Sequence, residues 1–170
     1  MLIRLTRLTN DRHQFEIVRD DGTRESHELE TRSTLLHDLA HYAVETEAGL
    51  ENSFYGRLAQ GIAYEALIQV PGAPEALQTE VVVALVQGAF KDGGSPKTDP
   101  AQCAREIAAG FRSTGGQPPV WLTPDFIART RERLRRVQGQ WRATPFHGTM
   151  ELEFPLRHGE DASSPTRPPA

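Results

Sequence analysis

Two histidines and two carboxylates lie close together between residues 36 and 45. Because an α-helix turns by about 100° per residue, His37, His41 and Glu45 share one arc of a helix about 100° wide, and Asp38 falls beside Glu45. Imidazole nitrogens and carboxylate oxygens are ligands that zinc, nickel, iron and manganese favour. We therefore expect His37, His41 and Glu45 to bind a divalent metal, with zinc as the first candidate. Asp38 would act as an outer acceptor or as the catalytic base on a bound water, which would allow metal-dependent hydrolysis.

The same arc also fits a solvated or hydrogen-bonded polar face, because leucines and alanines already fill the opposite arc. Histidine and carboxylate four residues apart attract each other weakly without a metal. From Glu16 to Glu51, ten acidic residues stand against three arginines, and this excess raises the local cation concentration without specifying an ion. Both interpretations, a metal or polar ligand site and an ordinary polar face, therefore stay open.

The spacing resembles the HExxH helix of zinc metallopeptidases, with Asp38 where that family has its glutamate base. The pair His37-Asp38 also resembles the dyad of HD-domain phosphohydrolases. A longer resemblance runs from the N-terminal strands through residues 37–45 to Phe54-Tyr55-Gly56, and it is to a group of uncharacterised bacterial proteins. That resemblance implies a shared small domain and no particular activity.

The elements around this segment follow from the pattern of apolar residues. Ile3 and Leu5 alternate with polar residues, as do Phe15 and Ile17, and a third stretch over residues 23–29 is polar enough for a sheet edge. These stretches predict a three-stranded meander. A final alternation over residues 150–156 predicts a strand at or near a sheet edge.

Helical spacing dominates between these strands. Residues 35–44 predict a helix that Thr31 or Ser33 caps and that Gly49 ends. The run 81–86 fits a helix or a buried strand, and the length of the surrounding segment favours the helix. Further helices are predicted over residues 53–60, 74–90, 99–111 and 123–141, with loops at 70–72, 92–98 and 115–119.

Strands at both ends and helices between them predict an α+β fold. We expect an antiparallel sheet of about four strands, the last joined to the N-terminal meander, with four to five helices packed on one face. Residues 1–156 would form a single domain. Residues 157–170 are rich in serine, proline and charge, and are expected to form a disordered tail.

Composition narrows the class of protein. The chain has 170 residues, a net charge of −4 and one cysteine, Cys103, which excludes an internal disulfide and a CxxC zinc site and fits a core position. No signal peptide, membrane-length apolar run, P-loop, GxGxxG or GxSxG motif is present. We expect a soluble cytoplasmic protein without a nucleotide cofactor. The sequence identifies no substrate.

The strongest rival interpretation is a non-catalytic interaction or scaffold protein, homodimeric and without metal. Six arginines lie between residues 129 and 142, along the last predicted helix and just after its expected end. They fit a solvated face, or they hold the acidic N-terminal region within the chain or across a dimer. Nucleic-acid binding is disfavoured by the net negative charge. His147, in the loop before the last strand, would complete a metal site only if the fold brings it near His37.

Overall fold

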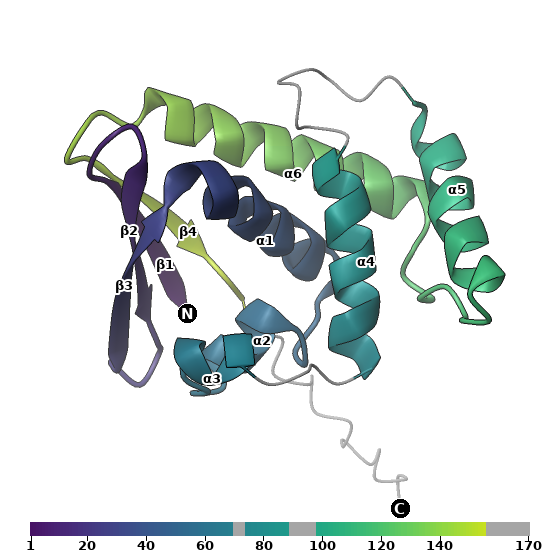
Figure 1. Cartoon of the computed structure of the whole chain (residues 1–170), viewed down its shortest axis with the longest axis horizontal. Coiled ribbons are helices and arrows are strands. Elements are labelled where there is room, and N and C mark those ends of the chain that lie inside the picture. Colours follow the sequence, from purple (N-terminus) through teal and green to yellow (C-terminus); the bar gives the residue numbers. More distant parts are fainter. Residues whose placement is uncertain (70–73, 89–97, 156–170) are drawn as a thin grey trace, which may run out of the picture.

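The computed structural model describes residues 1–69, 74–88 and 98–155 and confirms the α+β fold (Figure 1). One antiparallel sheet has the strand order β3-β2-β1-β4. The predicted meander, the joining of the last strand to it and the edge positions of the third and last strands are all confirmed. The strands are β1 (Leu2–Arg7), β2 (Arg12–Val18), β3 (Arg24–Glu30) and β4 (Thr149–Glu153).

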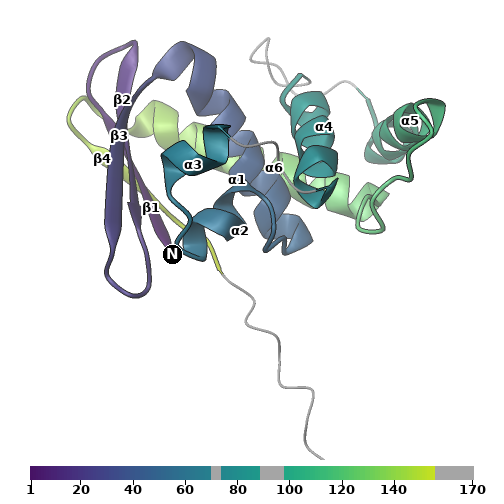
Figure 2. The ribbon, with the colours of Figure 1, turned by 60° about the horizontal axis from the view of Figure 1, so that its bottom comes forward.

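One face of this sheet is apolar and the other is charged, because successive side chains along a strand point to opposite faces. On the apolar face Ile3 pairs with Ile17, and both side chains are fully buried. On the other face Arg4 lies opposite Glu16 and forms an ion pair with it. The helices cover the apolar face, as predicted (Figure 2).

Six α-helices lie within the described residues, where four to five were expected. The additional helix is Tyr64–Gln69, which has only six residues and none that is buried. The helical interpretation of residues 81–86 is confirmed. The helices are α1 (Leu36–Ala48), α2 (Phe54–Ala59), α3 (Tyr64–Gln69), α4 (Pro74–Gly88), α5 (Pro100–Ser113) and α6 (Pro124–Ala143).

The start of α1 differs from the prediction. A π-helical turn, η1 (Thr31–Leu35), runs directly into α1, so neither Thr31 nor Ser33 caps the helix. The Thr31 hydroxyl instead lies 3.1 Å from Nδ1 of His13. Gly49 ends α1 as predicted, with a left-handed φ of 67° that favours glycine.

The helix α1 lies at the centre of the molecule, between the sheet, α4 and α6 (Figure 1). Every residue from Asp38 to Glu45 is buried, the polar ones included. A solvated face is therefore wrong for Asp38, His41 and Glu45. The hydrogen-bonded and metal-binding interpretations of these residues remain.

Several expectations fall outside the described residues: the loops at 70–72 and 92–97, and the tail at 157–170. The single domain and the cytoplasmic location stay predictions. Within the described ranges, no helix has the length and apolar character that crossing a membrane requires.

Candidate functional site

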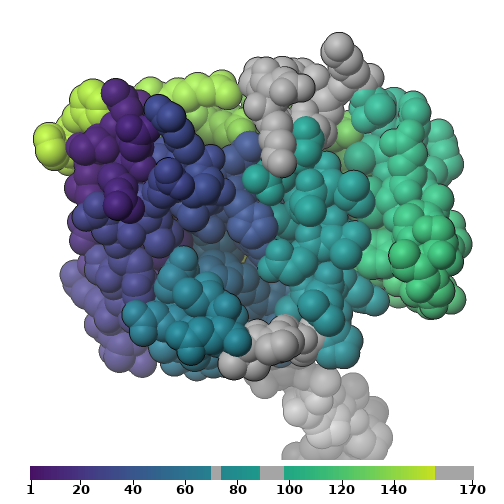
Figure 3. Space-filling model, viewed as in Figure 1, coloured from purple at the N-terminus to yellow at the C-terminus, as the bar shows by residue number. Residues whose placement is uncertain are grey.

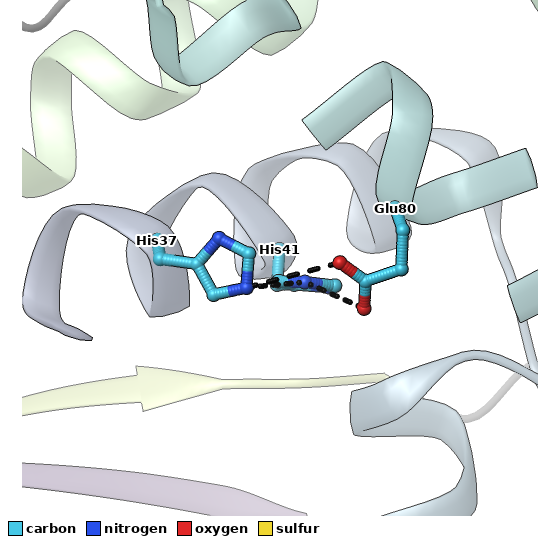
Figure 4. Close-up of side chains that lie close together, drawn as sticks. All are labelled: His37, His41 and Glu80. Atoms are coloured by element: carbon cyan, nitrogen blue, oxygen red, sulfur yellow. Dashed lines mark hydrogen bonds and ion pairs between the residues drawn. The ribbon is translucent and has the colours of Figure 1, made fainter. Parts of the chain in front are cut away.

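Two histidines of α1 meet a glutamate of α4 (Figure 4). The Nε2 atoms of His37 and His41 lie 3.2 Å apart. Oε1 of Glu80 lies 3.2 Å from Nε2 of His41, and Oε2 of Glu80 lies 3.8 Å from Nε2 of His37. One atom from each of the three side chains lies within 4.8 Å of the other two. We call His37, His41 and Glu80 the convergent cluster.

The outer nitrogen of each imidazole has its own acceptor. Nδ1 of His37 donates to Oε1 of Gln87 at 3.2 Å, and Nδ1 of His41 donates to Oε1 of Glu45 at 2.9 Å. In a neutral imidazole one nitrogen donates and the other accepts, so each Nε2 then presents a lone pair to the cluster. Two lone pairs and a carboxylate thus face one another, and such a set needs a cation between its members.

The spacing of the cluster suits one small ion. Two ligand atoms of a tetrahedral zinc ion, each about 2.0 Å from the metal, are about 3.3 Å apart. The two Nε2 atoms, and Nε2 of His41 with Oε1 of Glu80, are each separated by 3.2 Å, close to that value. The 3.8 Å contact to His37 is made by the other oxygen of Glu80, and with one ligand atom from each residue all three atoms lie within 4.8 Å of one another. Three protein ligands would leave the fourth tetrahedral position open.

Without a metal, a proton supplies the cation. Burial alone would lower the pKa of His41, but the hydrogen bonds and charges of Glu45 and Glu80 raise it to about 9. Burial and the neighbouring His41 lower the pKa of His37. Because metal ions compete with protons for imidazole nitrogen, a metal would take the place of this proton on His41.

Glu45 lies on the far side of His41 from the convergent cluster. Its carboxylate is fully buried and accepts hydrogen bonds from the backbone N–H groups of Tyr55, at 2.8 Å, and Gly56, at 3.4 Å. Glu45 was expected to be a third ligand, and the structure instead places it behind the imidazole of His41. A carboxylate in this position orients a metal-binding histidine and makes it more basic.

The backbone that holds Glu45 depends on the glycine at position 56. A Cβ atom added there would lie 2.4 Å from the carbonyl oxygen of Glu51, well inside van der Waals contact. The missing side chain therefore lets the residues before α2 pass close to its first turn. This approach aims two N–H groups of α2 at Glu45.

Asp38 lies apart from the convergent cluster but in the same pocket. The residue is 8% exposed, and Oδ2 is buried without a hydrogen-bond partner within the described part of the chain. Burial raises the pKa of this carboxyl to about 7, although the charge of His41 opposes the shift. Its expected part as outer acceptor or base stays a prediction.

A pocket of about 390 Å³ opens over the cluster. In the space-filling view it is the hollow between α1, α3 and α4 (Figure 3). His41 lies at its buried end, whereas His37 is half-buried and Glu80 is exposed. The open coordination position of an ion in the cluster would therefore be reachable by a small molecule.

Sequence reasoning missed Glu80. The sequence did contain one indication of its role: Glu80 is the only charged residue between positions 76 and 88. A lone carboxylate in an apolar helix indicates a specific partner. What the sequence lacked was the packing of α4 against α1.

Two other candidates are placed elsewhere. His147 lies in the turn before β4 with a positive φ of 62°, and its backbone N–H donates to the carbonyl of Arg7, so it does not join the convergent cluster. Cys103 is buried in the core, as expected.

The chain matches no protein-family model, no curated protein and no solved structure. The resemblance to a group of uncharacterised bacterial proteins therefore stays a prediction.

Proposed function

We propose that the protein binds one divalent transition metal, zinc foremost, through His37, His41 and Glu80, and uses it to hydrolyse a small molecule. The observation that carries the proposal is the convergence of two Nε2 atoms and a carboxylate at the buried end of a pocket. Each imidazole also has an outer acceptor on Nδ1. Sites with three protein ligands and an open position are typical of catalytic zinc.

The residues around the cluster would have two roles, positioning the imidazoles and accepting a proton or hydrogen bond. Gln87 and Glu45 are positioning residues, because they hold the two imidazoles by the nitrogen that faces away from the metal. A zinc ion in the cluster would lower the pKa of a bound water to about 7 and so supply hydroxide near neutral pH. Asp38, in the same pocket, would accept a proton or a hydrogen bond from water or substrate.

The test is a zinc titration of the full chain, purified without a histidine tag and stripped with chelator, followed by calorimetry and elemental analysis. We expect one zinc per chain. Glu80→Gln and His41→Ala should each weaken zinc binding at least about 10-fold, because a ligand is lost.

Glu75→Gln is the matched control, since Glu75 lies on the same helix outside the cluster. It should leave zinc affinity unchanged. Absence of stoichiometric zinc, or equal affinity of Glu80→Gln and Glu75→Gln, would overturn the proposal.

A second candidate, self-association, is favoured by the outer face of α4. Leu77, Val81 and Leu85 are 55%, 44% and 48% exposed, although a surface helix normally turns polar residues outward. Two copies of α4 packed antiparallel around Val81 would place Leu77 of one copy against Leu85 of the other. This self-complementary pattern suits a twofold dimer.

The arginines of α6 give this dimer no support. Two of them, Arg129 and Arg133, form ion pairs with Glu47 of the same chain. The test is the mass in solution by sedimentation: Val81→Glu should convert a dimer to monomer, whereas the control Val120→Glu, at a position 97% exposed, should not. A monomer at all concentrations tested would exclude the dimer.

A further inference from the structure

The pocket over the convergent cluster has two unlike sides. His37, His41 and Asp38 line it from α1, and Leu67, Ile68 and Leu77 line it from α3 and α4. Two further charged groups, Glu80 of α4 and Arg57 of α2, also line the pocket. Its volume of about 390 Å³ lies in the range of small-molecule sites and is too small for a folded partner. A ligand that fills it needs a polar head toward α1 and an apolar body toward α3 and α4.

Asp38 adds a requirement on the polar head. The residue is more than nine-tenths buried and lines the pocket, and its Oδ2 has no hydrogen-bond partner among the described residues. A buried acceptor without a partner is costly, and a ligand that brings an N–H or O–H removes that cost. The head of the ligand should therefore carry a donor close to the atom that binds the metal.

We infer that the substrate is an amide whose carbonyl oxygen faces the convergent cluster, whose N–H donates to Asp38 and whose apolar acyl chain lies against α3 and α4. An amide carries an acceptor oxygen and a donor N–H on the same carbonyl carbon, which an ester does not. This inference rests on the proposed metal site, because the carbonyl needs a cation to polarise it.

The reaction is then hydrolysis of the C–N bond. The oxygen of water forms a bond to the carbonyl carbon, the C–N bond breaks, and a proton passes to the leaving nitrogen. The products are a carboxylic acid with an apolar chain and an amine, and no other reactant is needed. Water supplies the proton that the leaving nitrogen takes, and the part of Asp38 in this proposal is to accept the hydrogen bond of the amide N–H.

Hydroxamates are suitable probes, because they bind zinc through two oxygens and carry an N–H. Octanohydroxamate should bind the zinc-loaded protein at least about 10-fold more tightly than acetohydroxamate, since each buried methylene strengthens binding about 4-fold. Leu77→Asn should reduce this preference. Leu85→Asn, on the same helix outside the pocket lining, should preserve it.

The hydrogen bond to Asp38 is tested with N-methyl-octanohydroxamate, which has no N–H. N-methylation should weaken binding to the wild-type protein about 10-fold and should have little effect on Asp38→Ala, which has no side-chain acceptor. An equal penalty in both proteins would overturn the assignment of Asp38.

The outcomes separate this inference from the proposed function. If the protein binds no zinc, the metal site is wrong and the inference is lost with it. If zinc binds but the two chain lengths bind equally well, the metal site stands and the amide with an apolar acyl chain is wrong.

Discussion

Glu45 and Glu47 lie two residues apart on α1 and meet entirely different surroundings. Glu45 is fully buried and faces the imidazole of His41 and two backbone N–H groups. Glu47 lies at the contact between α1 and α6 and forms ion pairs with Arg129 and Arg133. One carboxylate supports an imidazole, which gains and loses a proton, and the other is paired with guanidinium groups that keep their charge.

The difference shows how the two contacts of α1 are specialised. A guanidinium stays protonated at any working pH, so the Glu47 ion pairs only join helices. Burial would raise the pKa of Glu47, but hydrogen bonds from Arg133 and Arg129 lower it. The imidazole of His41 instead connects a buried anchor, Glu45, to the pocket, so the contact between α1 and α4 carries the proposed metal site.

The largest expected effect comes from removing the buried anchor. Glu45→Ala leaves the Nδ1–H of His41 and the N–H groups of Tyr55 and Gly56 buried without an acceptor. We expect a loss of about 3–5 kcal/mol in the free energy of unfolding, the cost typical of breaking a buried ion pair. Urea denaturation at pH 7 measures this loss, and a decrease below about 1 kcal/mol would contradict the buried anchor.

A second buried histidine, His13, has no carboxylate beside it and shows what burial alone does to an imidazole. His13 is fully buried, its Nε2 has no hydrogen-bond partner among the described residues, and its ring packs edge-on against Trp141. Burial lowers the pKa of His13 from 6.5 to about 4. This direction is opposite to that of His41, where two carboxylates raise the pKa.

The sign of the pH effect follows from this depression. Between pH 6.5 and 4 the unfolded chain binds a proton at His13 that the folded protein does not, so stability is full above pH 6.5 and falls as the pH drops. We expect the wild type to lose about 3 kcal/mol more than His13→Gln between pH 7 and pH 4. Urea denaturation of both proteins at the two pH values measures the difference, and parallel pH profiles would contradict it.

The smallest effect is expected at the contact with α6. The ion pair is partly open to solvent, because the side chain of Arg129 is 51% exposed although that of Glu47 is only 12% exposed. We expect Glu47→Ala to lower the free energy of unfolding by about 1 kcal/mol. The loss should shrink in 1 M NaCl, where surface charges are screened. A loss equal to that of Glu45→Ala would erase the distinction between the two carboxylates.

Most of the fold follows from local patterns in the sequence. Alternation marked the strands. The helices predicted from residues 99 and 123 begin there as α5 and α6, and the side chains of Asp99 and Thr123 accept backbone hydrogen bonds at their starts. The predicted cap of α1 was wrong, because the hydroxyl of Thr31 pairs with His13, a residue in another element. Capping rules consider only neighbouring residues, so they cannot predict that a distant side chain will take the hydroxyl instead.

Only the part of the site that lies on a single helix could be predicted from the sequence. Helical spacing brings His37 and His41 together, because both lie on one helix. That spacing also suggested Glu45, but it could not distinguish a carboxylate in front of the imidazole from one behind it. Glu80 comes from α4, 39 residues after His41, and only the packed structure brings it to the cluster.

The glycine at position 56 gives a practical way to recognise relatives of this chain. Any other residue there would collide with the carbonyl of Glu51 and displace the amides that hold Glu45. A chain that carries both histidines and the glutamate of α1 but a bulkier residue eleven positions after that glutamate would share the helix without sharing its support. In a search for relatives, a glycine at this position should distinguish chains with the same site from unrelated chains as well as the two histidines do.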